Sequence, residues 1–300
     1  MKDKKSKVTT RIVTNFTPSD DAVTEIVYCG NVTEVKVLAK SPANNISRFK
    51  HVGKYQFLDT LTGEVIESKR QDNSPNKPRK LNKSFEKLRC LINNNFQSNI
   101  NELHVTLTYG EKMEDFDTDS KDFKKFWEKL NYKYTDLEYI RIIEPQHTGR
   151  WHIHVLIKSH GNGYLFLPKE ELEKLWGHGY VWVDKMRNND NIGAYFTAIL
   201  KNVDLFEKDS EKPNETKFIV KGARLNYYPQ GKRFYSYSKG IKKPECKRTT
   251  YSEAMKTLNL NDLVYKKAIE ILITDDENEE PKTANTVLHM ELNSKRKKKS

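Results

Sequence analysis

The sequence lacks the features that define several large classes of protein. Its only cysteines, Cys29, Cys90 and Cys246, lie far apart, so neither a disulfide framework nor a zinc ribbon is expected. No apolar run approaches the length of a membrane span, and the polar start MKDKKSK has no signal-peptide core. A glycine loop of the G-x-x-x-x-G-K-[ST] kind is also missing, which argues against a fused helicase domain. We therefore expect a cytoplasmic protein with neither a membrane nor a nucleotide as partner.

Positive charge is what the sequence has in excess. The 300 residues carry a formal net charge of +12, and 36% of them are hydrophobic. A chain of this length and composition can bury one good core with appendages. The charge favours a polyanionic partner, with nucleic acid the leading candidate, and predicts DNA binding that weakens strongly as salt increases.

Composition divides the chain into three predicted parts. Residues 1–83 hold short strand-like runs that end in the turn-like LTGEV, followed by a basic, proline-containing linker. Residues 84–245 form the main domain, which begins with a helix capped by Ser84. Residues 246–300 contain an amphipathic helix from about Tyr251 to Ile273. The acidic and basic runs that follow are typical of a disordered tail.

The main domain alternates between strand and helix patterns. In order, the predicted elements are a strand at 103–110, a helix at about 119–129, a hairpin at 137–158, a helix opened by Pro168, a strand YVWVDKM, and a helix that starts at Asn191. This order predicts an α+β fold in which helices pack on one face of an antiparallel sheet. A small β-rich N-terminal region and a helical, charged C-terminal tail complete the predicted architecture.

The hairpin LEYIRIIEPQHTGRWHIHVLIK concentrates polar chemistry on one face. Successive side chains of a strand alternate between faces, so His152 and His154 lie together while the intervening residues form an apolar face. If Glu144 pairs opposite His152, its carboxylate joins the two imidazoles; a register slipped by one residue would turn it away. Two imidazoles and one carboxylate are a plausible site for a divalent metal. Histidines on a half-buried surface are the alternative interpretation.

Two further stretches carry candidate residues. The strand at 103–110 alternates, with His104, Thr106 and Thr108 on one face. Tyr195 lies in the first turn of the last helix, where polar groups can point towards a ligand. A core tyrosine with its hydroxyl at the rim is the alternative there.

These motifs together resemble those of a known superfamily. The strand HVTLTYG, the pair HIHV with an upstream glutamate, and a later tyrosine helix resemble the three motifs of HUH endonucleases. The closest resemblance is to rolling-circle replication initiator (Rep) proteins of bacterial plasmids and phages. The segments LWGHGYVWVDKM and KRFYSYSKGIKKP are similar to the flanking pieces of such proteins, so the resemblance covers about residues 84–245. Relaxases usually place the tyrosine before the histidine pair, and the order here therefore favours Rep.

The resemblance implies a metal-dependent endonuclease that nicks and rejoins DNA. His152, His154 and Glu144 would hold Mg²⁺ or Mn²⁺, and Tyr195 would attack single-stranded origin DNA. The products would be a 5′-phosphotyrosine and a free 3′-hydroxyl that starts rolling-circle replication, with unwinding left to a host helicase. A transposase or relaxase with the same chemistry, and a non-catalytic DNA-binding regulator, are the alternatives.

The sequence departs from the family pattern at one position. The lysine that many members place three residues after the tyrosine is Ala198 here. Its role would pass to Lys201, Lys185 or Arg187, or be absent, and Asn202 is the polar residue that returns to the helix face of Tyr195. The residues expected to contact DNA are Lys201, Asn202, Lys185, Arg187, Thr106, Thr108, Tyr235 and Tyr237. The spare candidates for the nucleophile are Tyr227, Tyr228, Tyr235 and Tyr237.

Overall fold

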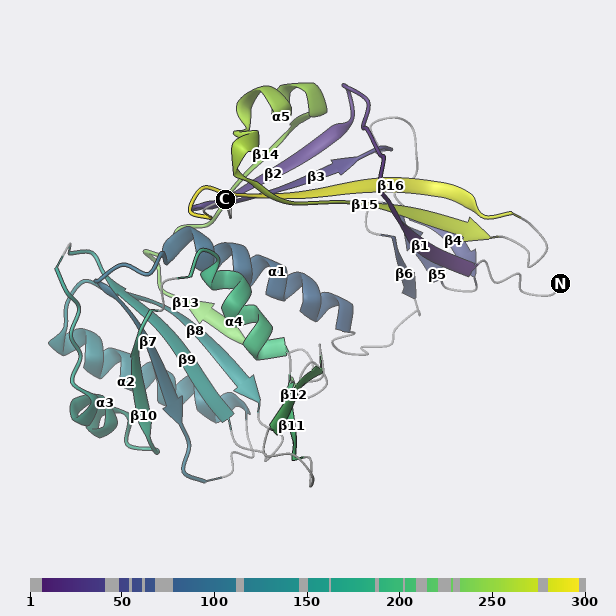
Figure 1. Ribbon diagram of the computed structural model, residues 1–300. Coiled ribbons are helices and arrows are strands. Elements are labelled where there is room, and N and C mark those ends of the chain that lie inside the picture. Colours follow the sequence, from purple (N-terminus) through teal and green to yellow (C-terminus); the bar gives the residue numbers. More distant parts are fainter. Residues whose placement is uncertain are drawn as a thin grey trace. The chain divides into compact units, whose positions relative to one another are not determined.

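The computed structural model divides the chain into two compact units (Figure 1). Residues 74–243 form the middle unit, and residues 1–73 and 244–300 together form the end unit. The structure describes residues 7–40, 49–53, 56–60, 63–67, 78–111, 116–145, 151–161, 163–186, 189–201, 203–208, 215–220, 228, 233–274 and 280–296. No helix in these described segments is both long and apolar enough to cross a membrane.

A five-stranded antiparallel sheet in the order β10–β7–β9–β8–β13 forms the centre of the middle unit. Its strands are β7 (Glu102–Thr108), β8 (Leu137–Pro145), β9 (Trp151–Ser159), β10 (Val181–Lys185) and β13 (Tyr235–Tyr237). Its helices are α1 (Pro78–Asn95), α2 (Phe116–Lys133), α3 (Lys169–Trp176) and α4 (Ile192–Lys201). A separate two-stranded ribbon pairs β11 (Val203–Lys208) with β12 (Glu215–Val220). The predicted α+β fold with an antiparallel sheet is confirmed.

Helices α2 and α3 cover the face of the sheet that the sequence marks as apolar. The cluster there contains Val105 and Leu107 of β7, Ile153, Val155 and Ile157 of β9, Phe123, Phe126 and Leu130 of α2, and Leu172 and Trp176 of α3. The alternating residues of β7 and β9 meet the apolar stripes of the two helices, as their periodicities of two and 3.6 residues require. This is the layer of helices that the sequence predicts.

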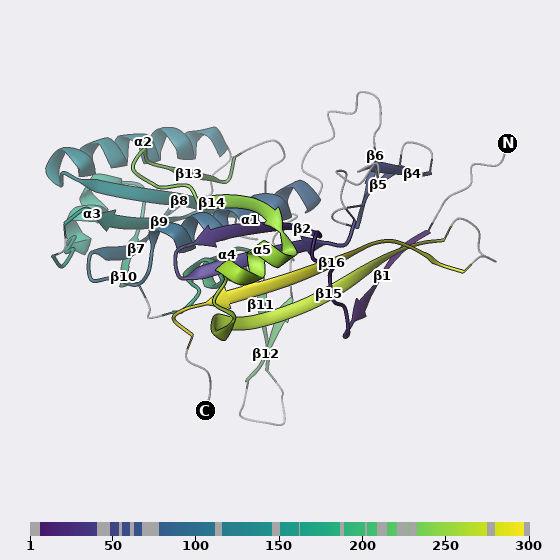
Figure 2. The same ribbon diagram turned by 90° about the horizontal axis from the view of Figure 1, so that it is seen from above.

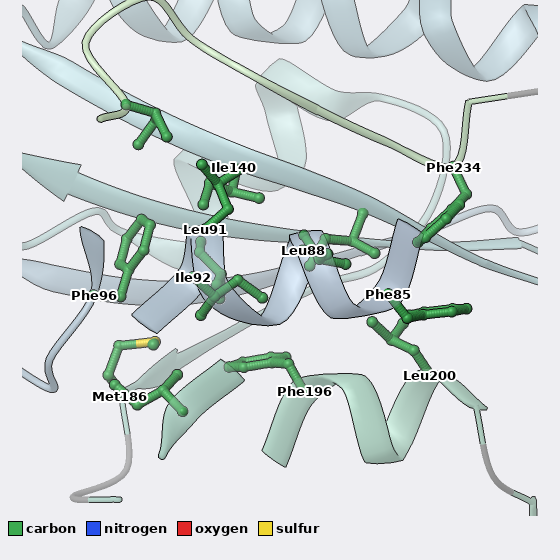
Figure 3. Close-up of a cluster of buried hydrophobic side chains, with 14 of the residues drawn as sticks. Phe85, Leu88, Leu91, Ile92, Phe96, Ile140, Met186, Phe196, Leu200 and Phe234 are labelled. Atoms are coloured by element: carbon green, nitrogen blue, oxygen red, sulfur yellow. The ribbon is translucent and has the colours of Figure 1, made fainter. Parts of the chain in front are cut away.

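Helices α1 and α4 add a second layer on the opposite face, which the sequence does not predict. The sheet lies between α2 and α1 when viewed from above (Figure 2). The second cluster contains Phe85, Leu88, Leu91 and Ile92 of α1, Ile140 and Ile142 of β8, Leu156 of β9, and Phe196 and Leu200 of α4 (Figure 3). Because both faces are covered, β8 and β9 carry buried residues on both sides along part of their length.

The first helix begins earlier than the sequence predicts. Ser84 lies within α1, which starts at Pro78, so the predicted cap at Ser84 is wrong. A proline suits the first helical position because its fixed φ is helical and its missing N–H has no partner there anyway. By contrast, the start of α4 is predicted correctly, since the Asn191 side chain accepts a hydrogen bond of 3.0 Å from the backbone of Ala194.

The end unit is built on a six-stranded antiparallel sheet in the order β1–β15–β16–β3–β2–β14. Its strands are β1 (Lys7–Val13), β2 (Val23–Cys29), β3 (Val32–Leu38), β14 (Glu245–Thr250), β15 (Leu263–Thr274) and β16 (Lys282–Asn293). A smaller sheet pairs β4 (Phe49–Gly53), β5 (Gln56–Asp59) and β6 (Glu64–Glu67). The predicted β-rich N-terminal region is confirmed.

The predicted C-terminal helix from Tyr251 to Ile273 is wrong beyond its first two turns. Helix α5 (Tyr251–Thr257) is followed by a short 3₁₀ turn, η3 (Leu260–Asp262), and then by β15. In place of hydrogen bonds within a helix, the backbone of this segment pairs with β16 along its length and, from Ala268 onwards, with β1 on its other side. Residues 282–293 form β16 instead of a disordered tail. Most of the acidic run lies outside the described residues.

A buried ion pair joins α2 to the sheet. The guanidinium of Arg141 on β8 contacts the carboxylate of Asp119 on α2, and their side chains are 7% and 1% exposed. The same guanidinium lies 4.9 Å from the ring centroid of Phe123. Removing one member of such a pair leaves the other charge buried without its counter-ion.

We expect Asp119→Ala to lower the free energy of unfolding by about 3–5 kcal/mol, because Arg141 would remain buried and unpaired. Urea denaturation followed by circular dichroism measures this change. Glu128→Ala on the same helix is the matched control. It removes an exposed pair with Lys124 and should change stability by less than about 1 kcal/mol. Equal effects of the two substitutions would contradict the prediction that the buried pair stabilises the fold more than the exposed pair does.

Candidate functional site

The register of three neighbouring strands brings the candidate residues together. Glu144 of β8 pairs with His152 of β9, which in turn pairs with Thr108 of β7. The next row of the same face places His154 opposite Thr106. The predicted hairpin register is therefore confirmed.

Glu144 lies between the two imidazoles of the hairpin. Its Oε2 atom is 2.8 Å from Nε2 of His154 and 3.7 Å from Nδ1 of His152. The Glu144 and His154 side chains are 4% and 10% exposed, whereas that of His152 is 34% exposed. The cluster is thus closed on the side of His154 and open to solvent at His152.

A third imidazole completes the cluster. Nε2 of His104 lies 3.0 Å from Nδ1 of His154, and the hydroxyl of Thr106 is 3.3 Å and 3.4 Å from these two nitrogens. The sequence predicts that His104 lies on this face but does not mark it as a site residue. Strand alternation was the available signal. Only the pairing of β7 with β9 shows which histidine it touches.

Burial keeps these imidazoles neutral. Burial and the neighbouring His154 lower the pKa of His104 to about 3, and burial and the neighbouring His152 do the same for the pKa of His154. Burial also lowers the pKa of His152. A neutral imidazole has one ring nitrogen with a free lone pair, which is the form that binds a metal ion.

Helix α4 is held close to α1 by a small polar network. The buried side chain of Asn93 accepts a hydrogen bond of 2.7 Å from the backbone of Gly193 and donates one of 2.9 Å to Asn191. A Cβ atom on Gly193 would lie only 2.2 Å from the backbone oxygen of Arg89. Only glycine therefore allows α4 to approach α1 so closely, and this close approach determines where the first turns of α4 lie.

Tyr195 shares a cavity with His104 and His154 as a result. A cavity of about 90 Å³ is lined by His104, His154, Lys185 and Tyr195, among others. The ring of Phe196 packs edge-on against His104 with centroids 4.8 Å apart, and Tyr195 next to it is 36% exposed. The structure thus brings a partly exposed phenol and two of the three imidazoles, those of His104 and His154, to one cavity.

The other predicted site residues are distributed over the middle unit. Thr108 uses its hydroxyl to hold the backbone of Tyr180. Tyr235 and Tyr237 lie on β13, at the edge of the sheet opposite β10, and neither lines the cavity. Tyr228 is buried and donates a hydrogen bond of 3.1 Å to the backbone oxygen of Leu200, which makes it a poor nucleophile candidate. The predictions for Arg187, Asn202, Tyr227 and the side chain of Lys201 fall outside the described residues.

All the residues that line this cavity lie in a segment of the chain that matches a protein family. Residues 102–203 match a family of replication-associated proteins, described as Replication-associated protein ORF2. The matched segment is about one third of the chain and runs from β7 through α4, so it includes His104, Glu144, both hairpin histidines and Tyr195. No match is found among curated proteins or among solved structures. The match indicates a replication-related role.

The depressed pKa of His104 predicts a pH dependence of stability. The unfolded chain takes up a proton on this residue near pH 6.5, whereas the folded protein does so only near pH 3. The free energy of unfolding should therefore be highest above pH 6.5 and fall as the pH drops towards 4.

His104→Gln should flatten part of this fall, because glutamine does not titrate. Urea denaturation at several pH values between about 7 and about 4 tests the expectation. His160→Gln, which replaces a 57% exposed imidazole beyond the end of β9, is the control and should leave most of the fall in place. Identical pH profiles for wild type and His104→Gln would contradict the prediction.

Proposed function

We propose that the protein is a replication initiator that nicks single-stranded origin DNA through attack by Tyr195. The main support is the cavity shared by Tyr195, His154 and His104, within the segment 102–203 that matches a replication-associated family. The order of the strand, the histidine pair and the tyrosine helix supports an HUH endonuclease of the rolling-circle type found in bacterial plasmids and phages. A basic chain with a net charge of +12 suits a DNA substrate.

His152, His154 and Glu144 would hold the divalent metal, Mg²⁺ or Mn²⁺. Nε2 of His154 and Oε2 of Glu144 are separated by 2.8 Å, a spacing at which both atoms can bind one metal ion. His152 is the exposed third donor, on the side from which a phosphate can approach. The bound ion would polarise the scissile phosphate and offset the charge that develops there.

His104 would orient His154 for metal binding. When Nδ1–H of His154 donates to Nε2 of His104, the Nε2 lone pair of His154 faces the carboxylate of Glu144. Two lone pairs at this distance repel each other unless a cation or a proton lies between them. Such outer partners fix the tautomer and orientation of a ligating histidine. We therefore include His104 in the proposed site as a positioning residue.

Tyr195 would supply the nucleophile. Its phenolic oxygen forms a bond to phosphorus while the bond to the 3′ oxygen breaks, which leaves a 5′-phosphotyrosine and a free 3′-hydroxyl. The phenolic proton is lost to solvent, and the leaving oxygen gains one. Because a phosphodiester is exchanged for a phosphodiester, the same site can rejoin ends without a nucleotide.

Among the cations that the structure describes, Lys185 is placed to assist. It lines the cavity with Tyr195, whereas Ala198 occupies the position of the usual lysine. A nearby ammonium favours the ionised phenol and the negative charge of the transition state. Unwinding of the origin would be left to a host helicase in the cytoplasm.

Alanine substitution tests the metal ligands. We expect His152→Ala and His154→Ala each to abolish nicking of a labelled single-stranded origin pool in Mn²⁺, and to weaken Mn²⁺ binding measured by calorimetry by about tenfold or more. Glu144→Ala should weaken Mn²⁺ binding less completely, because water can fill one position. His160→Ala is the control histidine and should behave as wild type. Full activity of either hairpin variant in chelator would overturn the metal site.

Tyr195→Phe tests the nucleophile. The ring is retained, so DNA and Mn²⁺ binding should persist while the nick and the covalent adduct disappear. Tyr237→Phe, at the far edge of the sheet, should keep both. Mapping of the trapped adduct should identify the peptide that contains Tyr195. Adduct on another tyrosine would overturn this assignment, and binding without any adduct would favour a non-catalytic regulator.

A further inference from the structure

The edge strand β10 presents aromatic side chains to solvent beside the proposed site. Trp182 is 62% exposed and Tyr180, which precedes the strand by one residue, is 73% exposed. Tyr164 and Phe166, in the segment that leads to α3, are 54% and 66% exposed. Large apolar side chains gathered on a surface commonly mark a site of interaction.

The register relates these rings to the imidazole cluster. Trp182 pairs with Thr106, which pairs on its other side with His154, so all three belong to one row across the sheet. Tyr180 lies opposite Thr108, as two hydrogen bonds between the Tyr180 backbone and the Thr108 hydroxyl show, and Thr108 pairs with His152. A single strand, β7, therefore separates the aromatic edge from the candidate metal ligands.

Two lysines lie beside the exposed aromatic rings. The ammonium of Lys169 lies 5.2 Å from the ring centroid of Trp182, and that of Lys185 lies 5.2 Å from the ring centroid of Tyr164. Aromatic faces with cations beside them are the chemistry that binds unpaired bases and their phosphates together. A duplex hides its base faces in the stack, so this surface suits a single strand.

We infer that Tyr180 and Trp182 form a base-stacking platform for the DNA strand on one side of the scissile phosphate. The strand crosses the β7 threonines between this platform and the imidazole cluster, and Lys169 neutralises a phosphate beside it. The inference rests on the proposed function for its ligand, single-stranded DNA. The DNA strand would follow this path on the protein, with its bases stacked on Tyr180 and Trp182.

Binding measured without cleavage tests the platform. Fluorescence anisotropy with a labelled single strand of about 12 nucleotides, in chelator, should show roughly tenfold weaker binding for Trp182→Ala and for Tyr180→Ala. Trp182→Phe, which keeps a stacking ring, should lose much less. Binding of the matched duplex should stay within about twofold of wild type for all three variants.

Tyr132→Ala is the matched control, because this tyrosine is 92% exposed and belongs to α2 and not to the edge strand. It should bind the single strand as wild type does. Circular dichroism should show that every variant is folded, as expected for exposed positions.

Single strands with one abasic nucleotide, placed in turn along the sequence, should locate the stacked base. At that position the abasic change and Trp182→Ala should be non-additive.

Several outcomes would overturn the platform. These are unchanged single-strand affinity in Trp182→Ala and Tyr180→Ala, an equal loss on the duplex, or an equal loss in Tyr132→Ala. Absence of any metal-dependent nick in wild type would refute the proposed nicking while leaving these binding results valid. Normal nicking by a protein whose edge variants bind normally would refute only the platform.

Discussion

Antiparallel pairing of β8 with β9 is the constraint on which the candidate site depends. The observed register places Glu144 beside His152 and within 2.8 Å of His154. A slip of one residue would move the carboxylate to the face covered by α2 and α3, because side chains alternate along a strand. The register is held firmly because apolar clusters pack on both faces of these two strands. The polar cluster thus lies on the face that α1 and α4 cover, beside the apolar residues that fix the register.

The contact between α1 and α4 supplies the second constraint. Asn93 uses both ends of its amide to hold the start of α4, and Gly193 removes the side chain that would prevent close approach. The helix then directs Phe196 into the core and leaves Tyr195 at the cavity. Burial of Phe196 against His104 links the packing of the helix to the imidazoles. The position of the phenol is therefore a consequence of helix packing.

The same middle sheet offers different surfaces at its two edges. At β13, Tyr235 packs against the core, while at β10 the aromatic residues point into solvent beside lysines. Edge strands expose unpaired backbone groups, and aromatic and charged side chains along β10 make this edge suited to a ligand rather than to a further strand. The end unit is organised differently, since its sheet interleaves strands from both ends of the chain.

Local periodicity and capping predict the strand at 151–159, the shared face of His152 and His154, and the start of α4 at Asn191 without any knowledge of distant contacts. Features that depend on distant partners could not be predicted in this way. His104 reaches His154 only through pairing of β7 with β9, and Tyr195 joins them only through the packing of α4 on α1. The strands β15 and β16 were not predicted, because the apolar residues of β15 fit a helix and the charged runs that flank β16 are typical of a disordered tail. Pairing with β1 and β3, more than 200 residues away, makes these segments strands.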